Sequence, residues 1–340
     1  MSKIPIIAVV GPTASGKSNL AVALAKHYDA EILSFDSMQL YKGMDIATAK
    51  PTADEMQGIP HHMISVVDND EAFSVARYKE SADRIIDEIT ARGKRVVMVG
   101  GTGLYLDTVM QNIELLQGED TTEIREQLKA ELAELGSAAM LGKLREIDPK
   151  TAETLHENNT GRVLRALEVY YSTGHTMSYQ VENSKNTPSR YRPVYIGLNA
   201  KDRDFLYNRI NSRVDVMLQT GLLTEVEQFV NSAPGTTAKQ AIGLKELAPY
   251  ARGEESLDTA VERLKMETRR YAKRQLTWFR RNENVNWLYI DELQTAEALL
   301  GAAIDIVDNS KIFSRSSLVI SCSVRKSFFI IVNPPVLQIH

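Results

Sequence analysis

A glycine-rich motif near the amino terminus constrains the fold of this chain more than any other feature. An apolar run over residues 4–10 precedes the motif and suits a buried parallel strand, and residues 19–27 after it carry apolar side chains at helical spacing. Strand, glycine-rich turn and helix are the context of a phosphate-binding loop, whose backbone amides face a di- or triphosphate. The motif has the pattern G-x-x-x-x-G-K-[ST] and consists of Gly11, Pro12, Thr13, Ala14, Ser15, Gly16, Lys17 and Ser18.

Two side chains of this loop are candidates for direct chemistry. Lys17 can reach the terminal phosphate oxygens, and the hydroxyl of Ser18 can hold Mg²⁺, the cofactor that we expect. A chance match in a plain strand-to-helix turn is the alternative, and the flanking patterns argue against it. The motif predicts a phosphate site without indicating whether the bound group is ATP.

Composition limits the class of protein. A chain of 340 residues with 43% apolar and 25% charged residues is typical of a globular protein with one large domain and an insertion, or with two domains. Its net charge of −4 means that any nucleic-acid surface must be local. Cys322 is the single cysteine, so no disulfide framework forms and we expect a cytoplasmic location. We expect no signal peptide and no membrane partner, because no apolar stretch reaches the ~20 residues that span a bilayer.

The first 110 residues alternate between strand and helix patterns. Residues 31–35 and 95–99 are typical of buried strands, and residues 74–92 form a helix pattern with Ser74 as N-cap and Gly93 just past the end. Such alternation predicts a parallel sheet, whose ligands bind at the carboxyl ends of the strands. The predicted fold class is α/β, with a P-loop NTPase-like parallel sheet core flanked by helices and an all-helical insertion domain.

Helical patterns dominate the rest of the chain. Residues 122–136, 138–147 and 161–173 have no strand pattern between them, which indicates a helical insertion. Strand patterns return at residues 191–198 and 287–290. Further helices are expected at residues 202–219, 224–231, 238–250 and 256–281.

These patterns divide the chain into three parts. We predict a discontinuous core at residues 1–115 and 190–300, with the helical insertion at 116–189. Residues 309–340 combine Ser-rich, basic and apolar pieces without a helical period. We expect them to be an atypical, disordered tail outside the working domain, from a read-through or a frame-shift. A genuine edge strand is the alternative.

Asp36 is the strongest single candidate for a catalytic residue outside the phosphate loop. It follows the predicted strand at 31–35, and a carboxylate beside a phosphate site has two functional interpretations. It can hold Mg²⁺ or act as a general base that takes a proton from the nucleophile. An N-capping Asp without chemistry is the structural alternative. The spacing does not decide between base and metal ligand.

A second glycine-rich turn follows the predicted strand at 95–99. It contains Gly100, Gly101, Thr102 and Gly103. Its glycines allow the backbone to approach a ligand closely, and Thr102 can donate a hydrogen bond to a bridging phosphate oxygen. A tight turn between strand and helix also favours glycine, so this turn alone is weak evidence for a ligand site. Together with the phosphate loop it is stronger evidence.

Basic residues gather at three other places. Arg209 and Arg213 share one helix face, where a pair of guanidinium groups suits a pyrophosphate, although a solvated face is the plainer interpretation. Residues 263–281 hold eight Lys or Arg side chains interleaved with aromatic residues, a pattern that suits an RNA backbone or a solvated face. Arg162 and Arg165 form a smaller basic spot. We predict no zinc site at His61 and His62, because no cysteine or third histidine lies at ligand spacing.

Several ordered motifs together resemble the tRNA dimethylallyltransferases, also called tRNA isopentenyltransferases. The resemblance runs from about residue 6 to about residue 281, and it is far more specific than the phosphate loop alone. Besides that loop, the motifs are DSMQ at 36–39, MDIATAKP at 44–51, HH at 61–62, GGTGLY at 100–105, RVLRALEV at 162–169, QAIG at 240–243 and YAKRQLTWF at 271–279.

The resemblance implies a reaction. A dimethylallyl group moves from dimethylallyl diphosphate to the exocyclic N6 amine of the adenosine just 3′ of the anticodon, so the loop holds a prenyl diphosphate and not ATP. Asp36 corresponds to the general base of the family. Lys17, Thr102, Arg213 and Mg²⁺ stabilise the leaving diphosphate.

The resemblance also implies how tRNA binds. The target base leaves the anticodon-loop stack and contacts Asp36, Ser37, Met38, Gln39 and Thr102. The insertion, with Gly161, Arg162 and Arg165, and the basic helix near Arg274 grip the anticodon stem-loop. The two histidines become structural, and a monomer is expected.

Four positions depart from the family pattern. Ser18 stands where Thr is usual, Ala47 where Gly is expected, Leu244 where Tyr is expected, and Gly161 where a polar or basic residue is common. Two other functions are weighed: an enzyme acting on a small molecule, either an adenine-nucleotide prenyltransferase or a nucleotide kinase, and a non-catalytic RNA-binding protein. The insertion and the basic helix favour an RNA substrate, and the intact Lys17, Ser18 and Asp36 favour catalysis.

Overall fold

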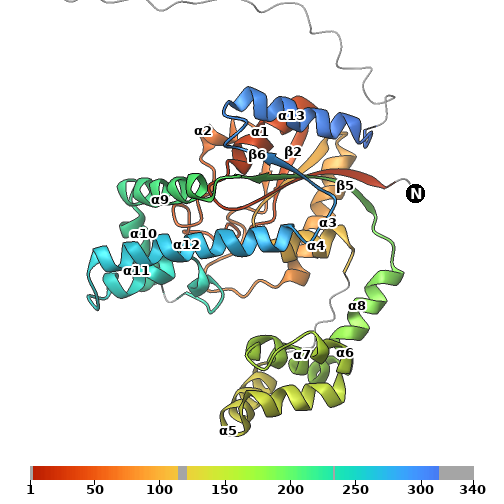
Figure 1. Cartoon of the computed structure of the whole chain (residues 1–340), viewed down its shortest axis with the longest axis vertical. Helices are drawn as coiled ribbons and strands as arrows, with labels where there is room; N and C mark the ends of the chain where they lie inside the picture. The colour runs from red at the N-terminus through yellow and green to blue at the C-terminus, as the bar shows by residue number, and fades with distance from the viewer. Residues whose placement is uncertain (1–2, 114–120, 233, 314–340) are drawn as a thin grey trace, which may run out of the picture.

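A six-stranded sheet organises the computed structural model, which describes residues 3–113, 121–232 and 234–313 (Figure 1). Its strand order is β3-β2-β4-β1-β5-β6, and every neighbouring pair is parallel. The α/β class with a parallel sheet is therefore confirmed. The strands are β1 (Ile4–Val10), β2 (Ala30–Ser34), β3 (His61–His62), β4 (Arg95–Val99), β5 (Tyr191–Asn199) and β6 (Val285–Tyr289).

Alternating side chains of β1 supply two hydrophobic cores, one on each face of the sheet. Ile6, Ala8 and Val10 belong to one core and Ile7 and Val9 to the other, and all five are fully buried. Strands covered on both faces read as continuous apolar runs, as β1 does. Helices α3 (Val75–Ala91) and α4 (Gly103–Met110) pack on the first face, and α1 (Lys17–Tyr28) and α13 (Ala296–Asn309) on the second.

A group of helices extends the core beyond the sheet on one side (Figure 1). Helix α12 runs along the carboxyl ends of β1 and β4, since Gln275 hydrogen-bonds to Thr13 and to Gly101, which follow those strands. The group consists of α9 (Arg203–Gln219), α10 (Leu222–Asn231), the 3₁₀ turn Ala238–Gln240, α11 (Leu244–Ala251) and α12 (Leu257–Phe279).

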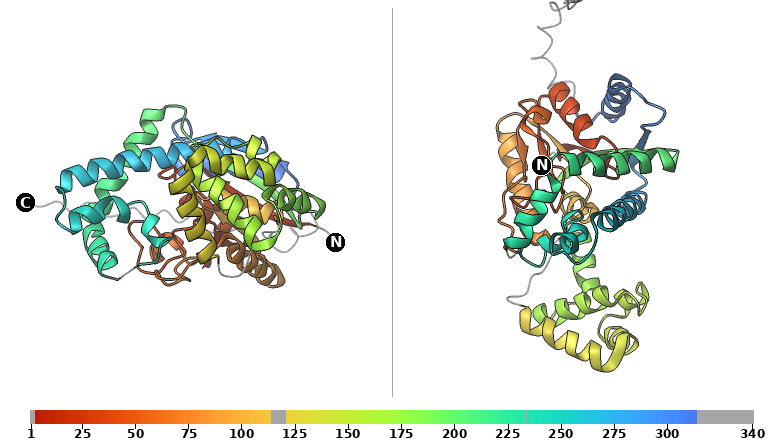
Figure 2. Two further views of the ribbon diagram at one scale, coloured as in Figure 1. Left: turned by 90° about the horizontal axis from the view of Figure 1, so that it is seen from below. Right: turned by 90° about the vertical axis from the view of Figure 1, so that its left-hand side faces the viewer.

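The insertion is helical and has a core of its own, centred on Leu128, Leu144 and Leu167. It lies apart from the sheet in both figures that show the whole chain (Figures 1 and 2). The expected break near residue 136 is a kink inside one helix, at Gly136 with φ 80° and ψ 168°. Its helices are α5 (Thr122–Ile147), α6 (Pro149–Glu153), α7 (Thr160–Thr173) and α8 (Met177–Asn186).

Other elements differ from the sequence prediction. A continuous helix over 238–250 is wrong, because Gly243 (φ 101°) interrupts it before α11 begins. Helix α13 was not predicted. Its buried residues Ala303 and Val307 belong to the core, which therefore extends beyond residue 300. The short α2 (Ala53–Met56) was also missed. The expected tail lies outside the described residues from 314 onward. No helix in the described ranges is both long and apolar enough to cross a membrane.

Candidate active site

The phosphate loop joins β1 to α1 through backbone conformations that favour glycine. Gly11 has φ 141°, and a Cβ there would lie 2.4 Å from the carbonyl oxygen of Leu198 on β5. Gly16 (φ 88°) is the N-cap of α1, and Ala14 also has a positive φ of 62°. The loop therefore lies tightly against β5 and presents the start of α1 to the cavity at the end of the sheet.

Two side chains of the loop suit an anion. Ser15 is 1% exposed, and its Oγ has no hydrogen-bond partner among the described residues. Lys17 donates a hydrogen bond from Nζ to the Pro12 carbonyl at 2.5 Å. Desolvation, together with the nearby Arg213, lowers the pKa of Lys17 to about 7. An anionic ligand beside Lys17 in the cavity would favour the charged form of the lysine.

Asp36 follows β2 and caps the turn that begins with it. Its Oδ1 accepts hydrogen bonds from the backbone N–H of Met38 at 2.9 Å and of Gln39 at 3.4 Å. Desolvation raises the pKa of Asp36, and the two N–H groups, Lys17 and Arg213 oppose that rise. The capping interpretation is thus correct for this turn, but the same carboxylate also lines the cavity. Asp36 can therefore cap the turn and also act on a ligand in the cavity.

The second glycine-rich turn is hydrogen-bonded to the turn that begins at Asp36. Thr102 Oγ1 accepts a hydrogen bond from the Ser37 backbone N–H at 3.0 Å and donates one to Ser37 Oγ at 3.1 Å. Gly100 and Gly101 line the cavity, so the expected close approach of their backbone to a ligand stays a prediction, and packing against protein atoms also requires glycine at this turn. A Cβ would lie 2.7 Å from Phe35 at Gly100, 2.0 Å from Gln275 at Gly101 and 2.1 Å from Trp278 at Gly103.

Arginines of α9 reach the same place, so the interpretation of this face as merely solvated is wrong. Arg209 donates a hydrogen bond from Nε to the Ala14 carbonyl at 2.9 Å. Arg213 lines the cavity beside Lys17 and Asp36, and desolvation lowers its pKa. Three charged groups from three elements therefore converge at the end of the sheet.

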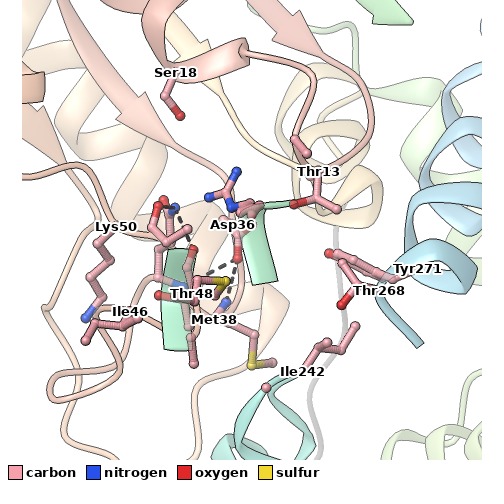
Figure 3. A pocket seen from close by; sticks show the side chains of 18 of the residues that line it. Thr13, Ser18, Asp36, Met38, Ile46, Thr48, Lys50, Ile242, Thr268 and Tyr271 are labelled. Atoms are coloured by element: carbon pink, nitrogen blue, oxygen red, sulfur yellow. Dashed lines mark hydrogen bonds between the residues drawn. The ribbon is translucent and has the colours of Figure 1, made fainter. Parts of the chain in front are cut away.

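These groups open into one cavity of about 1030 Å³ (Figure 3). In this view Ser18 and Thr13 lie in the upper part, Asp36 lies centrally, Tyr271 lies at the right and Ile242 lies at the bottom. Of the predicted site residues, those that line the cavity are Thr13, Ala14, Gly16, Lys17, Ser18, Asp36, Ser37, Met38, Gln39, Arg213 and Arg274.

The other predicted tRNA contacts lie elsewhere. Gly161, Arg162 and Arg165 are exposed on α7 of the insertion, and none of them lines the cavity. Arg165 forms an ion pair with Glu168, which also pairs with Arg125.

Only part of the basic stretch at 263–281 faces solvent. Arg263 pairs with Glu255, Lys265 with Asp215, and Arg269 donates to the side chain of Asn211 at 2.7 Å. These three cations hold α12 to its neighbours, an arrangement that neither an RNA-facing stretch nor a solvated face predicts for them. Among the described residues, the exposed basic side chains of this stretch that show no bond to a neighbouring helix are Arg270, Lys273, Arg274, Arg280 and Arg281, and Arg270 pairs with Glu267 on α12 itself.

Sequence reasoning missed two buried polar residues at the site. Gln275 is 4% exposed; its Oε1 accepts a hydrogen bond from the Thr13 backbone N–H at 2.8 Å, and its Nε2 donates to the Gly101 carbonyl at 3.1 Å. Glu225 is 9% exposed and binds three backbone N–H groups of the segment from Asp45 to Ala47. A polar residue at an otherwise buried helix position was the available signal for both.

A family model described as IPP transferase matches residues 39–282. This chain belongs to the IPP transferase family. It is 49% identical over 297 residues to a tRNA dimethylallyltransferase of Acetivibrio thermocellus, covering 87% of this chain and 95% of the relative. It is 42% identical over 312 residues to that of Clostridioides difficile, covering 91% and 99%.

Solved structures of the family have the same fold. The full-length tRNA isopentenylpyrophosphate transferase of Bacillus halodurans matches with a TM-score of 0.68 and 41% identity, over 93% of this chain and 99% of the other. A eukaryotic dimethylallyltransferase solved acting on tRNA matches with a TM-score of 0.74 and 29% identity, over 90% and 80%. The P-loop NTPase-like core is therefore confirmed for this IPP transferase family member.

Three sequence features of the family member have a structural explanation. His62 Nε2 lies 2.7 Å from Glu31 Oε2, and that glutamate also pairs with Arg92, so the histidine joins β3 to β2. Ala47, where glycine was expected, lies against Gly243, at which a Cβ would be 3.2 Å from that of Ala47. Leu244, where tyrosine was expected, is fully buried.

Proposed function

We propose that this protein is a tRNA dimethylallyltransferase. It transfers the dimethylallyl group of dimethylallyl diphosphate to the N6 amine of the adenosine immediately 3′ of the anticodon, giving N6-(dimethylallyl)adenosine and diphosphate. The observation that carries the proposal is a single cavity of about 1030 Å³ containing both an anion-binding loop and a half-buried carboxylate, Asp36. The relatives named above support the same activity.

Asp36 acts as the general base. The N6 lone pair attacks C1 of the dimethylallyl group while the bond from C1 to the diphosphate oxygen breaks. The diphosphate leaves with that electron pair, and Asp36 accepts the proton that N6 loses. The purine ring delocalises the N6 lone pair, so removal of the proton is needed. A raised pKa makes the Asp36 carboxylate a stronger base than an exposed one.

The leaving group develops negative charge, which cations can stabilise. Lys17 and Arg213 line the cavity beside the loop and are the cations that can stabilise this charge. Thr102, the other residue assigned to catalysis, reaches this region through its bonds to Ser37.

Mg²⁺ fits this set of donors. It prefers oxygen ligands and keeps several waters and substrate phosphates in its coordination shell. The described part of the chain holds no cluster of three or more His, Cys, Asp or Glu side chains suited to a metal. The Ser18 hydroxyl at the cavity is the protein oxygen that we assign to it. When bound, Mg²⁺ supplies charge neutralisation for the diphosphate.

The tRNA presents its anticodon loop to the cavity. The turn of Ser37, Met38 and Gln39 contacts the extruded adenosine, and Arg274 at the cavity contacts the backbone. We infer that the anticodon stem-loop also contacts the insertion through Gly161, Arg162 and Arg165. A monomer acting in the cytoplasm completes the proposal.

Radiolabelled dimethylallyl diphosphate tests this function. Purified protein and Mg²⁺ are incubated with unmodified tRNA in one tube and AMP in another. Label should enter tRNA and depend on adenosine at the position 3′ of the anticodon. Label in AMP alone would instead indicate a small-molecule prenyltransferase, and ATP hydrolysis without prenyl transfer would indicate a kinase or ATPase.

A further inference from the structure

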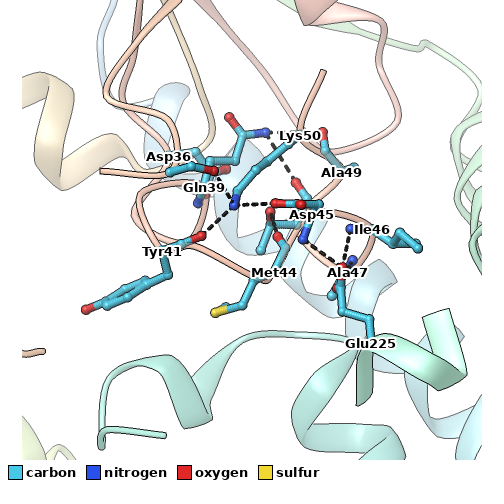
Figure 4. Close-up of polar contacts among 12 residues, drawn as sticks. Asp36, Gln39, Tyr41, Met44, Asp45, Ile46, Ala47, Ala49, Lys50 and Glu225 are labelled. Carbon is cyan, nitrogen blue, oxygen red and sulfur yellow. Dashed lines mark hydrogen bonds and ion pairs between the residues drawn. The ribbon is translucent and has the colours of Figure 1, made fainter. Parts of the chain in front are cut away.

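Glu225 on α10 binds a loop that forms one wall of the cavity (Figure 4). Its Oε2 accepts hydrogen bonds from the backbone N–H groups of Asp45 and Ile46, both at 2.7 Å, and its Oε1 accepts one from Ala47 at 2.8 Å. Three consecutive backbone N–H groups form an anion-binding site, and the Glu225 carboxylate is the anion that occupies it. Bonds of this kind, in which the acceptor is ionised, are stronger than neutral ones.

The wall held by Glu225 is joined to the turn of the general base. Gln39 donates hydrogen bonds from Nε2 to the Thr48 and Ala49 carbonyls at 3.2 and 3.3 Å. The backbone N–H of the same residue donates to Asp36 Oδ1. Glu225 therefore holds residues 45–47, the backbone continues to residues 48 and 49, and Gln39 joins these to the Asp36 carboxylate.

Lys50 braces the other end of the wall. Its side chain is 5% exposed, and its Nζ donates to the Tyr41 carbonyl, to Asp45 Oδ1 at 2.7 Å and to Ser65 Oγ at 2.8 Å. Tyr41 ends the turn that Asp36 begins, so the turn is tied to the wall at two places.

We propose that Glu225 is a positioning residue for Asp36, acting through residues 45–49 and Gln39. This inference rests on the proposed function, in which Asp36 is the base. Glu225 holds the wall, and the wall holds Gln39, whose N–H fixes the carboxylate that takes the proton. When Glu225 loses its negative charge, the wall loosens and the carboxylate moves.

The best test is Glu225→Gln with Glu227→Gln as the matched control. The glutamine amide has one oxygen and one N–H₂ group, so a donor replaces an acceptor for at least one of the three backbone N–H groups, and that hydrogen bond is lost. Glu227 is exposed on the same helix, so its variant makes the same charge change away from the wall. We expect kcat to fall about 10- to 100-fold in Glu225→Gln, with KM for dimethylallyl diphosphate unchanged and the control like the wild type.

The pH profile separates positioning from loss of fold. The N–H groups of Met38 and Gln39 lower the pKa of Asp36, so their loss should move the acidic limb of kcat/KM to higher pH. The other titratable and charged groups that face Asp36 are unchanged in the variant, and these are Lys17, Arg213, Tyr78, Tyr105 and Tyr271. A fall in kcat without this displacement would contradict the proposal.

A second variant and a second measurement keep the test decisive if Glu225→Gln fails to fold. Lys50→Met should lower kcat in the same way, with Lys42→Met, which removes only an exposed ion pair with Asp68, as its control. Hydrogen exchange of residues 36–50 should rise in both wall variants and in neither control. Unchanged exchange and kcat would overturn the role of Glu225. Failure of the wild type to transfer label would instead overturn the proposed function.

Discussion

At the scale of single residues, the site depends on charged groups held away from water. Asp36, Lys17 and Arg213 come from a turn, a helix start and α9; Asp36 raises the pKa of both cations, and Lys17 and Arg213 both lower the pKa of Asp36. Desolvation makes the carboxylate more basic and the lysine less so. Both changes suit a site in which a proton is removed and an anion is bound.

Asp36→Asn should abolish transfer while preserving binding. Asn keeps an oxygen that can accept the N–H of Met38 but cannot take a proton, so kcat should fall about 10²- to 10⁴-fold. Single-turnover transfer measures the chemical step, and filter binding measures tRNA affinity. Near-normal transfer per bound tRNA would show that Asp36 is not the base.

Lys17 should make the binding of dimethylallyl diphosphate depend on pH. Its pKa in the free protein is about 7, and a bound diphosphate favours the charged form. Below pH 7 the lysine is already charged and binding takes up no proton at this group. Above pH 7 binding must take up a proton, so Kd should rise by up to about tenfold per pH unit until the pKa of the complex is reached. Calorimetry in buffers of different ionisation enthalpy measures the uptake.

A Lys17→Arg variant provides the control for that titration. Arginine stays charged at these pH values, so the proton uptake assigned to this position should disappear. If the same uptake persists in Lys17→Arg, another group is responsible.

At the scale of elements, glycines in the core set how closely segments approach. Gly11→Ala should destabilise the protein, because the new Cβ would lie 2.4 Å from the Leu198 carbonyl at a φ of 141°. The free energy of unfolding should fall by at least about 1–3 kcal/mol. Gly142→Ala on α5 is the matched control, since nothing lies within 4 Å of its Cβ position and helices favour alanine. Urea unfolding compares the two; equal stability would refute this account of the loop.

At the scale of the whole molecule, the cavity and the basic residues of the insertion lie in two parts of the chain that have separate hydrophobic cores. The sheet core contains the cavity, whereas the insertion has a separate hydrophobic core and exposes Arg162 on α7. Under the proposed function, the insertion affects the affinity for tRNA and leaves the binding of the prenyl donor unchanged.

Arg162→Ala should raise KM for tRNA and leave KM for dimethylallyl diphosphate unchanged. The dependence of tRNA affinity on salt should weaken by about one phosphate contact. Arg145→Ala, which removes an exposed charge from α5 of the same insertion, is the control. Equal effects of the two variants would indicate that only the overall charge of the insertion matters.

The sequence by itself determined the local features of this protein. Residues adjacent in the chain fix the phosphate loop, the buried strands and the Ser74 cap of α3, whose side chain accepts the N–H of Arg77 as expected. The kink at Gly136 also has a local cause. The order of the motifs was sufficient to indicate the family, because each motif is short and continuous.

Only the tertiary structure decided which distant residues support the site. Gln275 lies 262 positions from Thr13, and Glu225 lies 178 positions from Ala47, yet each pair is hydrogen-bonded. Local spacing alone left Arg213 on a face that could be solvated, and the packing of α9 places it beside Lys17 and Asp36, as the family resemblance implied. The glycines at 100, 101 and 103 make room for Phe35 and for the Gln275 and Trp278 side chains of α12. Such contacts depend on how helices pack against the sheet, and neither residue type nor local spacing contains that information.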